Sequence, residues 1–168
     1  MHCKNVDAMV DGTVDKYYLM CKDKLTGILS YDFAKDKFSF EEDSDYKGMH
    51  PFPAIKFGEV KDKSNPWDEL IKDWVDDRVI QENRPDCREV LEYFNLSYYN
   101  QWDICRKNSG MSMDDYFWLT KDLSVEYEDI NIRYCAINGV KPKYLAPFPI
   151  IKYPSLIDII GGFEIEWI

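Results

Sequence analysis

Short apolar or alternating runs near the start of the chain, and one further along, are typical of β-strands. They lie at 17–20, 28–33, 38–40 and 116–119. Gly27 and the polar stretch 34–37 separate the first three runs and have the composition of turns. We therefore expect three antiparallel strands joined as a meander, and a later strand that follows the helical part of the chain.

The middle of the chain repeats apolar residues every three or four positions, as amphipathic helices do. Asn65 and Pro66 suit the N-cap and first position of a first helix. Its apolar stripe consists of Trp67, Leu70, Ile71, Trp74 and Val75. A second helix is expected to begin near 83–85 and to bury Cys87, Val90, Leu91 and Phe94. A third is predicted over 97–107, with Gly110 as its terminator.

These elements predict an α+β fold, in which a short antiparallel sheet packs with a three-helix lobe. We divide the chain into a loosely ordered N-terminus (1–15), an α+β module (16–134) and a strand-rich C-terminal extension of the same domain (135–168). The extension is expected to add an extended segment and a last strand. A Pro-Phe-Pro sequence recurs in 51–57 and 147–153, either as two extended edge segments or as a repeat.

Composition narrows the classes of protein that the chain can belong to. Its 168 residues include 21 basic and 31 acidic ones, a net charge of −10, which opposes direct binding to nucleic acid. No apolar run approaches the roughly 20 residues that cross a bilayer. Five cysteines without C-x-x-C spacing suit a reducing compartment. We expect a cytoplasmic protein that does not contact membranes.

The sequence contains no recognisable catalytic motif, and we predict no catalytic residue, no cofactor and no metal. The acidic segment 41–45 lacks the spacing of a calcium-binding loop and is interpreted as solvated. Cys87 and Cys105 lie in helical stretches, where small buried roles are commoner than nucleophilic ones. Asp114 or Asp115 is expected to cap a turn rather than to act in acid–base chemistry.

Three arginines, Arg78, Arg84 and Arg88, gather near the junction of the first two predicted helices. Guanidinium groups bind oxyanions in bidentate fashion, so the three are a candidate site for a phosphate or for a partner's carboxylates. The alternative is that they pair within the chain. The expected acidic partners are then Asp76, Asp77, Glu82 and Glu89.

Residues 70–84, followed by Glu89-Val90-Leu91, resemble a segment of HipA-like proteins of Firmicutes, with a tryptophan, an arginine and then Asn-Arg at similar spacing. Further on, 109–119 is similar to their Gly-Leu-Ser-Leu-Asp-Asp-Tyr-Trp box, and 128–131 is similar to the Glu-Asp-Ile-Asn that follows it. The resemblance covers roughly residues 16–134. It implies the N-terminal, non-kinase region of these proteins.

In the longer relatives this region precedes a serine/threonine kinase domain, and no kinase residue can be placed on 135–168. The resemblance therefore implies a non-catalytic interaction module of a toxin–antitoxin type system. The resemblance further implies a protein partner, with a HipA-type kinase as the candidate. The alternative hypothesis is an acidic inhibitor or nucleic-acid mimic from a mobile element, for which the charge of −10 is the motivation. The oligomeric state is left open.

Overall fold

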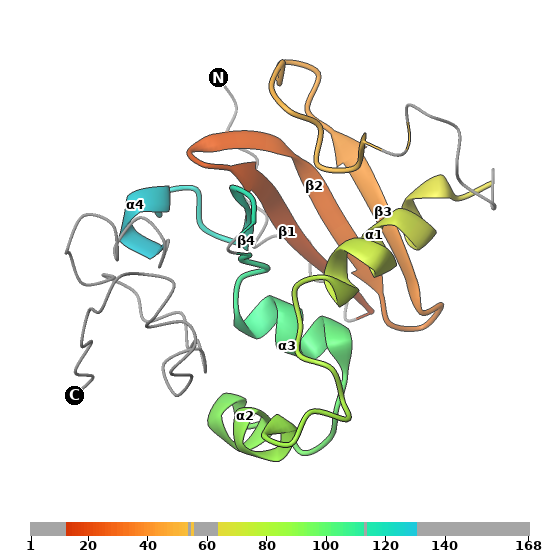
Figure 1. The fold of residues 1–168 in the computed structure, drawn as a ribbon. Helices are drawn as coiled ribbons and strands as arrows, with labels where there is room; N and C mark the ends of the chain where they lie inside the picture. The colour runs from red at the N-terminus through yellow and green to blue at the C-terminus, as the bar shows by residue number, and fades with distance from the viewer. Residues whose placement is uncertain (1–12, 54, 56–63, 113, 131–168) are drawn as a thin grey trace.

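The computed structural model describes residues 13–53, 55, 64–112 and 114–130 and confirms an α+β fold (Figure 1). The strands are β1 (Val14–Cys21), β2 (Lys24–Asp32), β3 (Lys37–Glu42) and β4 (Phe117–Thr120). The helices are α1 (Pro66–Asp76), α2 (Cys87–Phe94), α3 (Gln101–Lys107) and α4 (Tyr127–Ile130). The expected C-terminal extension, with its extended segment and last strand, lies outside the described residues, as does the second Pro-Phe-Pro sequence.

The described strands form one antiparallel sheet in the order β3-β2-β1-β4. β1, β2 and β3 make the predicted meander, and β4 pairs with β1 after the helical segment. Leu29 lies opposite both Tyr17 and Phe40, and Leu19 lies opposite Leu119. Because side chains alternate between the two faces of a sheet, this register gathers the leucines on one face.

α1 and α3 cover that face and enclose the main core (Figure 1). Its fully or nearly fully buried members include Leu19, Leu29, Ile71, Val75, Cys105 and Leu119. Trp102 of α3 packs against the rings of Tyr31 and Phe38 at centroid distances of 5.7 and 5.2 Å. Phe52, from the first Pro-Phe-Pro sequence, is also buried here. Residues 51–53 therefore anchor a loop to the core and form no strand.

The opposite face of the sheet carries a second apolar cluster. It consists of Tyr18, Met20, Met111, Trp118, Tyr127 and Ile130. α4 contributes two of these side chains. A helix of four residues is too short to show a hydrophobic period, which is why the sequence pattern did not predict it.

α2 lies away from the sheet and packs against Ile104 of α3, whereas Trp102 and Cys105 of α3 belong to the main core (Figure 1). Val90 and Phe94 of α2 bury themselves against Ile104, as the helical period predicts. Asn95 ends α2 in the left-handed conformation, with φ of 58°. We call residues 87–107 the helical lobe.

Several element boundaries differ from those expected from the sequence. β1 begins at Val14, two residues before the predicted start of the module. α3 begins at Gln101 rather than 97, because the Asn100 side chain accepts the Asp103 N–H at 2.9 Å and caps the helix there. Asn65 occupies the N-cap position of α1, but its side-chain amide donates to the Phe38 carbonyl at 3.1 Å instead of capping.

Gly110 follows α3, as the sequence predicts. This position requires glycine for two separate reasons. Its φ is +59°, and a Cβ would lie 2.8 Å from the Trp74 ring and 3.0 Å from Leu119. Its N–H donates to the Cys105 carbonyl at 2.8 Å and so satisfies the end of α3.

We expect Gly110→Ala to lower the free energy of unfolding by about 2 kcal/mol, because it adds both left-handed strain and overpacking. Urea denaturation followed by tryptophan fluorescence measures this. Ser109→Ala is the matched control, since Ser109 already holds a side chain at φ of 58°. Equal losses in the two variants would contradict the packing argument.

Candidate functional site

Arg78, the first of the three candidate arginines, is directed into the protein. Its side chain is only 4% exposed and stacks on the Trp74 ring at 3.7 Å. Its Nε donates to the Gly110 carbonyl at 2.9 Å and one terminal nitrogen donates to the Trp74 carbonyl at 3.1 Å. The other terminal nitrogen pairs with Asp115. Every guanidinium nitrogen thus has a partner within the chain.

Burial lowers the pKa of Arg78, and the charge of Asp115 opposes that shift. The same carboxylate accepts the Phe117 N–H at 2.9 Å, which confirms the predicted turn-capping role of Asp115. Arg78 and Asp115 therefore join the end of α1 to the start of β4. The two residues are 37 positions apart in the sequence, so no local sequence pattern indicates that they form a pair.

The other two candidate arginines lie on the helical lobe and its approach. Arg84 pairs with Asp86 at 2.8 Å, and Arg88 pairs with Glu92 one helical turn on at 3.0 Å. Arg88 is 90% exposed. The three arginines therefore pair within the chain, with Asp115, Asp86 and Glu92 respectively. Arg78 does not join the other two in one anion site, because its guanidinium is buried among α1, Gly110 and Asp115.

Two tyrosines of the helical lobe expose much of their side chains to solvent. Tyr93 is 56% and Tyr98 is 64% exposed, and both belong to the helical lobe. Tyr93 lies one turn after Glu89 on the exposed side of α2, which also presents Arg88. The helical period of α2 could have shown this for Tyr93, because it falls outside the apolar stripe. We call Arg88, Tyr93 and Tyr98 the lobe surface.

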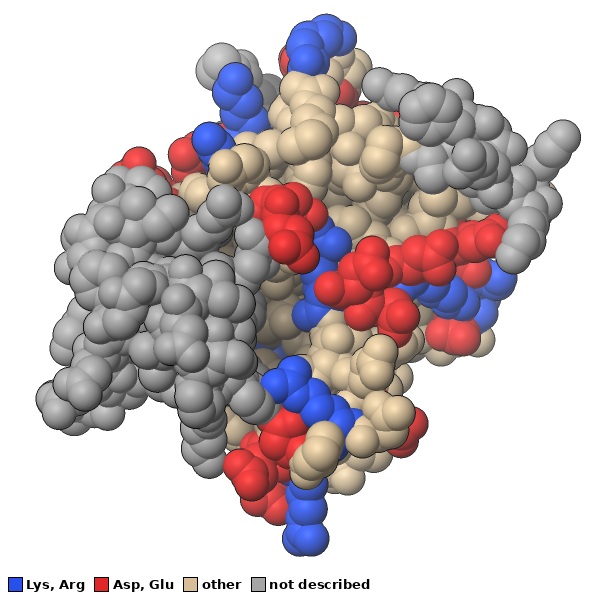
Figure 2. All heavy atoms as spheres, in the orientation of Figure 1, with Lys and Arg blue, Asp and Glu red and all other residues tan. Residues whose placement is uncertain are grey.

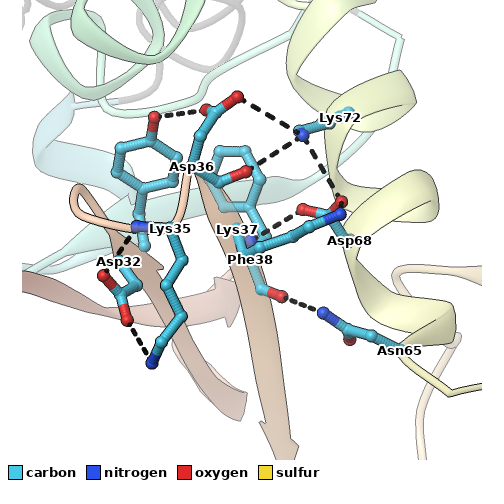
Figure 3. A network of polar contacts seen from close by, with 9 residues as sticks. Asp32, Lys35, Asp36, Lys37, Phe38, Asn65, Asp68 and Lys72 are labelled. Carbon is cyan, nitrogen blue, oxygen red and sulfur yellow. Dashed lines mark hydrogen bonds and ion pairs between the residues drawn. The ribbon is translucent and has the colours of Figure 1, made fainter.

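A polar network fastens α1 to the edge of the sheet (Figure 3). The Asp68 carboxylate accepts the Phe38 N–H and the Lys37 ammonium, both at 2.8 Å. Lys72 approaches Asp68 at 3.3 Å, and Asp36 accepts the Tyr31 hydroxyl at 2.7 Å. Burial and this bond raise the pKa of Tyr31 to about 12.

Around this network, lysines and aspartates balance one another. Lys35 pairs with Asp32 at 2.9 Å, and Lys72 also reaches the Asp36 carbonyl at 3.1 Å. Asn65 and Asp68 bind the outward carbonyl and N–H of Phe38, so these α1 side chains occupy hydrogen-bonding groups that an edge strand would expose. We interpret this network as a structural contact between α1 and the sheet, because its lysines and aspartates already neutralise one another.

The exposed face of α1 carries acidic residues along its length. They are Glu69, Asp73, Asp76 and Asp77, at intervals of four, three and one residues. Figure 2 shows acidic side chains gathered over this helix. The helical period places all four on one side of α1, opposite Ile71, Trp74 and Val75. We call this the acidic face.

Cys87, Cys105 and His50 are held by burial or by contacts with neighbouring residues. Burial raises the pKa of the Cys105 thiol to about 12, which keeps it protonated and unreactive, and burial also raises the pKa of Cys87. His50 accepts the Phe52 N–H on Nδ1 at 2.9 Å and stacks on Trp67. Within the described residues, no three His, Cys, Asp or Glu side chains are arranged to hold a metal ion.

Comparison of the chain with protein-family models, with curated proteins and with solved structures finds no match. These comparisons identify no catalytic family or fold. Among helices in the described part of the chain, none has the length and apolar character needed to cross a membrane.

Proposed function

We propose that this protein is a non-catalytic interaction module that binds a protein partner through the lobe surface. The observation that carries the proposal is that Tyr93, Tyr98 and Arg88 of the helical lobe are all largely exposed. Tyrosine and arginine are enriched at the energetic centres of protein interfaces, where large amphipathic side chains are buried by the partner. The free thiols of Cys21, Cys87 and Cys105 support a cytoplasmic location.

The resemblance of residues 16–134 to the N-terminal region of HipA-like proteins suggests the class of partner. We propose a HipA-type kinase, held by this module rather than assisted by it in catalysis. The helical lobe suits docking, because it protrudes from the sheet and is attached chiefly through α3 (Figure 1).

The proposal predicts that a photo-reactive phenylalanine analogue placed at Tyr98 crosslinks to a HipA-type kinase encoded in the same genome and co-expressed with the chain. The matched control is the same analogue at Met49, which is 59% exposed but lies outside the helical lobe. Replacing both Tyr93 and Tyr98 by alanine should weaken the purified complex at least about tenfold.

Equal crosslinking from positions 98 and 49, or none from position 98, would contradict this use of the lobe surface. Calorimetry with magnesium and ATP tests the non-catalytic part. We expect no heat of binding, and a saturable signal would show that the protein binds nucleotide itself.

The second candidate, an acidic inhibitor or nucleic-acid mimic, is favoured by the acidic face of α1 (Figure 2). Carboxylates repeated along one side of a helix can occupy a basic channel that normally holds phosphates. In that case the partner is a nucleic-acid-binding enzyme. The photo-reactive analogue should then crosslink to this enzyme when it replaces Asp73 and not when it replaces Tyr98. The complex would also dissociate as salt is raised.

A further inference from the structure

His50 lies in the loop that follows β3, and its side chain is only 14% exposed among groups from three parts of the fold (Figure 1). Its Nδ1 accepts the backbone N–H of Phe52, from the same loop, at 2.9 Å. Its Nε2 lies 3.4 Å from the Glu42 carboxylate of β3, the charged side chain that contacts it in the described part of the chain. The imidazole also stacks on the Trp67 ring of α1 with an angle of 15° between the planes.

These contacts respond in opposite ways to protonation of the imidazole. A ring nitrogen that accepts an N–H carries no proton, so the neutral ring bears its proton on Nε2, which faces Glu42. A second proton can enter only at Nδ1, where it would set two N–H donors against each other. The contacts with Glu42 and Trp67 remain favourable, because a carboxylate and the face of an indole both attract a cation. Protonation therefore breaks the Phe52 contact and keeps the other two.

The contact that protonation breaks belongs to the point where the loop enters the main core. Phe52 is 3% exposed, and its ring packs against Phe40 at 5.2 Å and against Trp74 at 6.3 Å. Pro51 and Pro53 have no backbone N–H, so that of Phe52 is the only backbone donor in residues 51–53. A buried N–H that loses its acceptor costs free energy. Loss of the bond should therefore weaken the attachment of the loop.

We propose that His50 is a pH-sensitive switch for this loop. The neutral imidazole binds the Phe52 N–H and holds residues 50–53 against the main core, and the imidazolium releases that N–H and pairs with Glu42. The hold is complete at the pH where the ring is neutral and is lost as pH falls. Imidazoles change charge between about pH 5 and about pH 8, so the switch operates in the physiological range. It uses other residues than the lobe surface and does not depend on the proposed partner binding.

The test is hydrogen exchange of the Phe52 amide, followed by NMR on the full chain at about pH 8 and about pH 5. Each rate is divided by that of His50→Asn at the same pH, which cancels the intrinsic dependence of exchange on pH. Asparagine can accept an N–H two residues on and does not titrate in this range. We expect a ratio near one at the higher pH and about five at the lower pH, as loss of one ordinary hydrogen bond predicts.

Two further variants separate the hydrogen bond from the other contacts of the ring. His50→Phe keeps a flat ring for Trp67 but has no acceptor, so its Phe52 amide should exchange fast at both pH values. Glu42→Gln keeps the acceptor but removes the carboxylate that attracts the imidazolium. The rise in exchange should then occur at lower pH than in the natural chain.

The natural chain also gives a readout that needs no variant to fold. Its Phe52 amide shift should follow the same titration curve as the ¹³C signal of the His50 ring. The proposal is overturned if the two curves differ, if the exchange ratio is the same at both pH values, or if His50→Phe protects the Phe52 amide as well as the natural chain does at the higher pH.

Discussion

Replacing Arg78 by alanine is expected to lower the free energy of unfolding by about 4 kcal/mol, the largest effect of any single substitution considered for this protein. The guanidinium lies over Trp74 at 3.7 Å and binds the carbonyls of Gly110 and Trp74 together with Asp115. Alanine removes all of these contacts at once. It also leaves the Asp115 charge without its partner.

Arg78→Lys tests how much of the stability comes from the positive charge and how much from the shape of the guanidinium group. A lysine ammonium keeps the positive charge but has no planar group to stack on Trp74, and it cannot reach three acceptors in different directions. We expect it to restore part of the stability and to remain about 2 kcal/mol below the natural protein. Urea denaturation of the purified variants measures both losses.

Arg88→Ala is the control for the arginine series, since Arg88 is 90% exposed and its ion pair with Glu92 is a surface contact. Its denaturation midpoint should match that of the natural protein. If Arg78→Ala were as mild as Arg88→Ala, the buried guanidinium would not be the link between α1 and β4.

Asp68→Ala is expected to cost about 3 kcal/mol, because it leaves the Phe38 N–H and Lys37 without their acceptor at the edge of the sheet (Figure 3). Asp68→Asn retains a side-chain oxygen for the Phe38 N–H but loses the charge that binds Lys37 and Lys72. It should therefore cost less than the alanine variant.

The loss in Asp68→Asn should depend on pH in a defined direction. Burial alone would raise the pKa of Asp68, but hydrogen bonds from Lys37, the Phe38 N–H and Lys72 outweigh it and lower this pKa. A lowered carboxyl pKa stabilises the fold fully above the unfolded value of 3.8, and this stabilisation is lost as pH falls through the folded value. The stability gap to the natural protein should be constant near neutral pH and close below about pH 3.8.

Asp73→Asn provides the comparison, as it makes the same charge change on the exposed side of α1. The free energy of unfolding of Asp73→Asn should stay close to that of the natural protein at every pH. A gap for Asp68→Asn that persists unchanged at acid pH would mean that shape, and not the ionised carboxylate, holds α1 to β3.

Both predictions concern stability, yet they bear on the proposed function. Arg78 and Asp68 fasten the two ends of α1, the helix that presents the acidic face and leads into the helical lobe. A variant that loosens either end would alter how the lobe is held. Binding experiments should therefore use the surface substitutions at Tyr93 and Tyr98, whose side chains are largely exposed and whose loss leaves the core intact.

The amino-acid sequence by itself determined the features that depend on neighbours along the chain. The period of Ile71, Trp74 and Val75 specified α1 and its buried side, and the apolar runs specified the strands of the meander. Such patterns are readable because a helix or strand repeats its orientation at a constant interval. The pattern does not fix the first residue of α3, because the cap formed by the Asn100 side chain decides where this helix begins.

Only the tertiary structure decided which partners the charged and polar side chains take. Asn65 and Asp68 lie at the start of α1, as their sequence positions indicate. Their side chains do not cap the helix, because β3 lies close enough for both to bind the backbone of Phe38. Arg78 finds Asp115 only because β4 pairs with β1 and brings its preceding turn beside the end of α1. The Tyr127 N–H finds Asp23 in the same way, from a segment 104 residues away in the sequence. Long side chains reach whatever the fold places near them, and that placement depends on how α1, α3 and the four strands pack together.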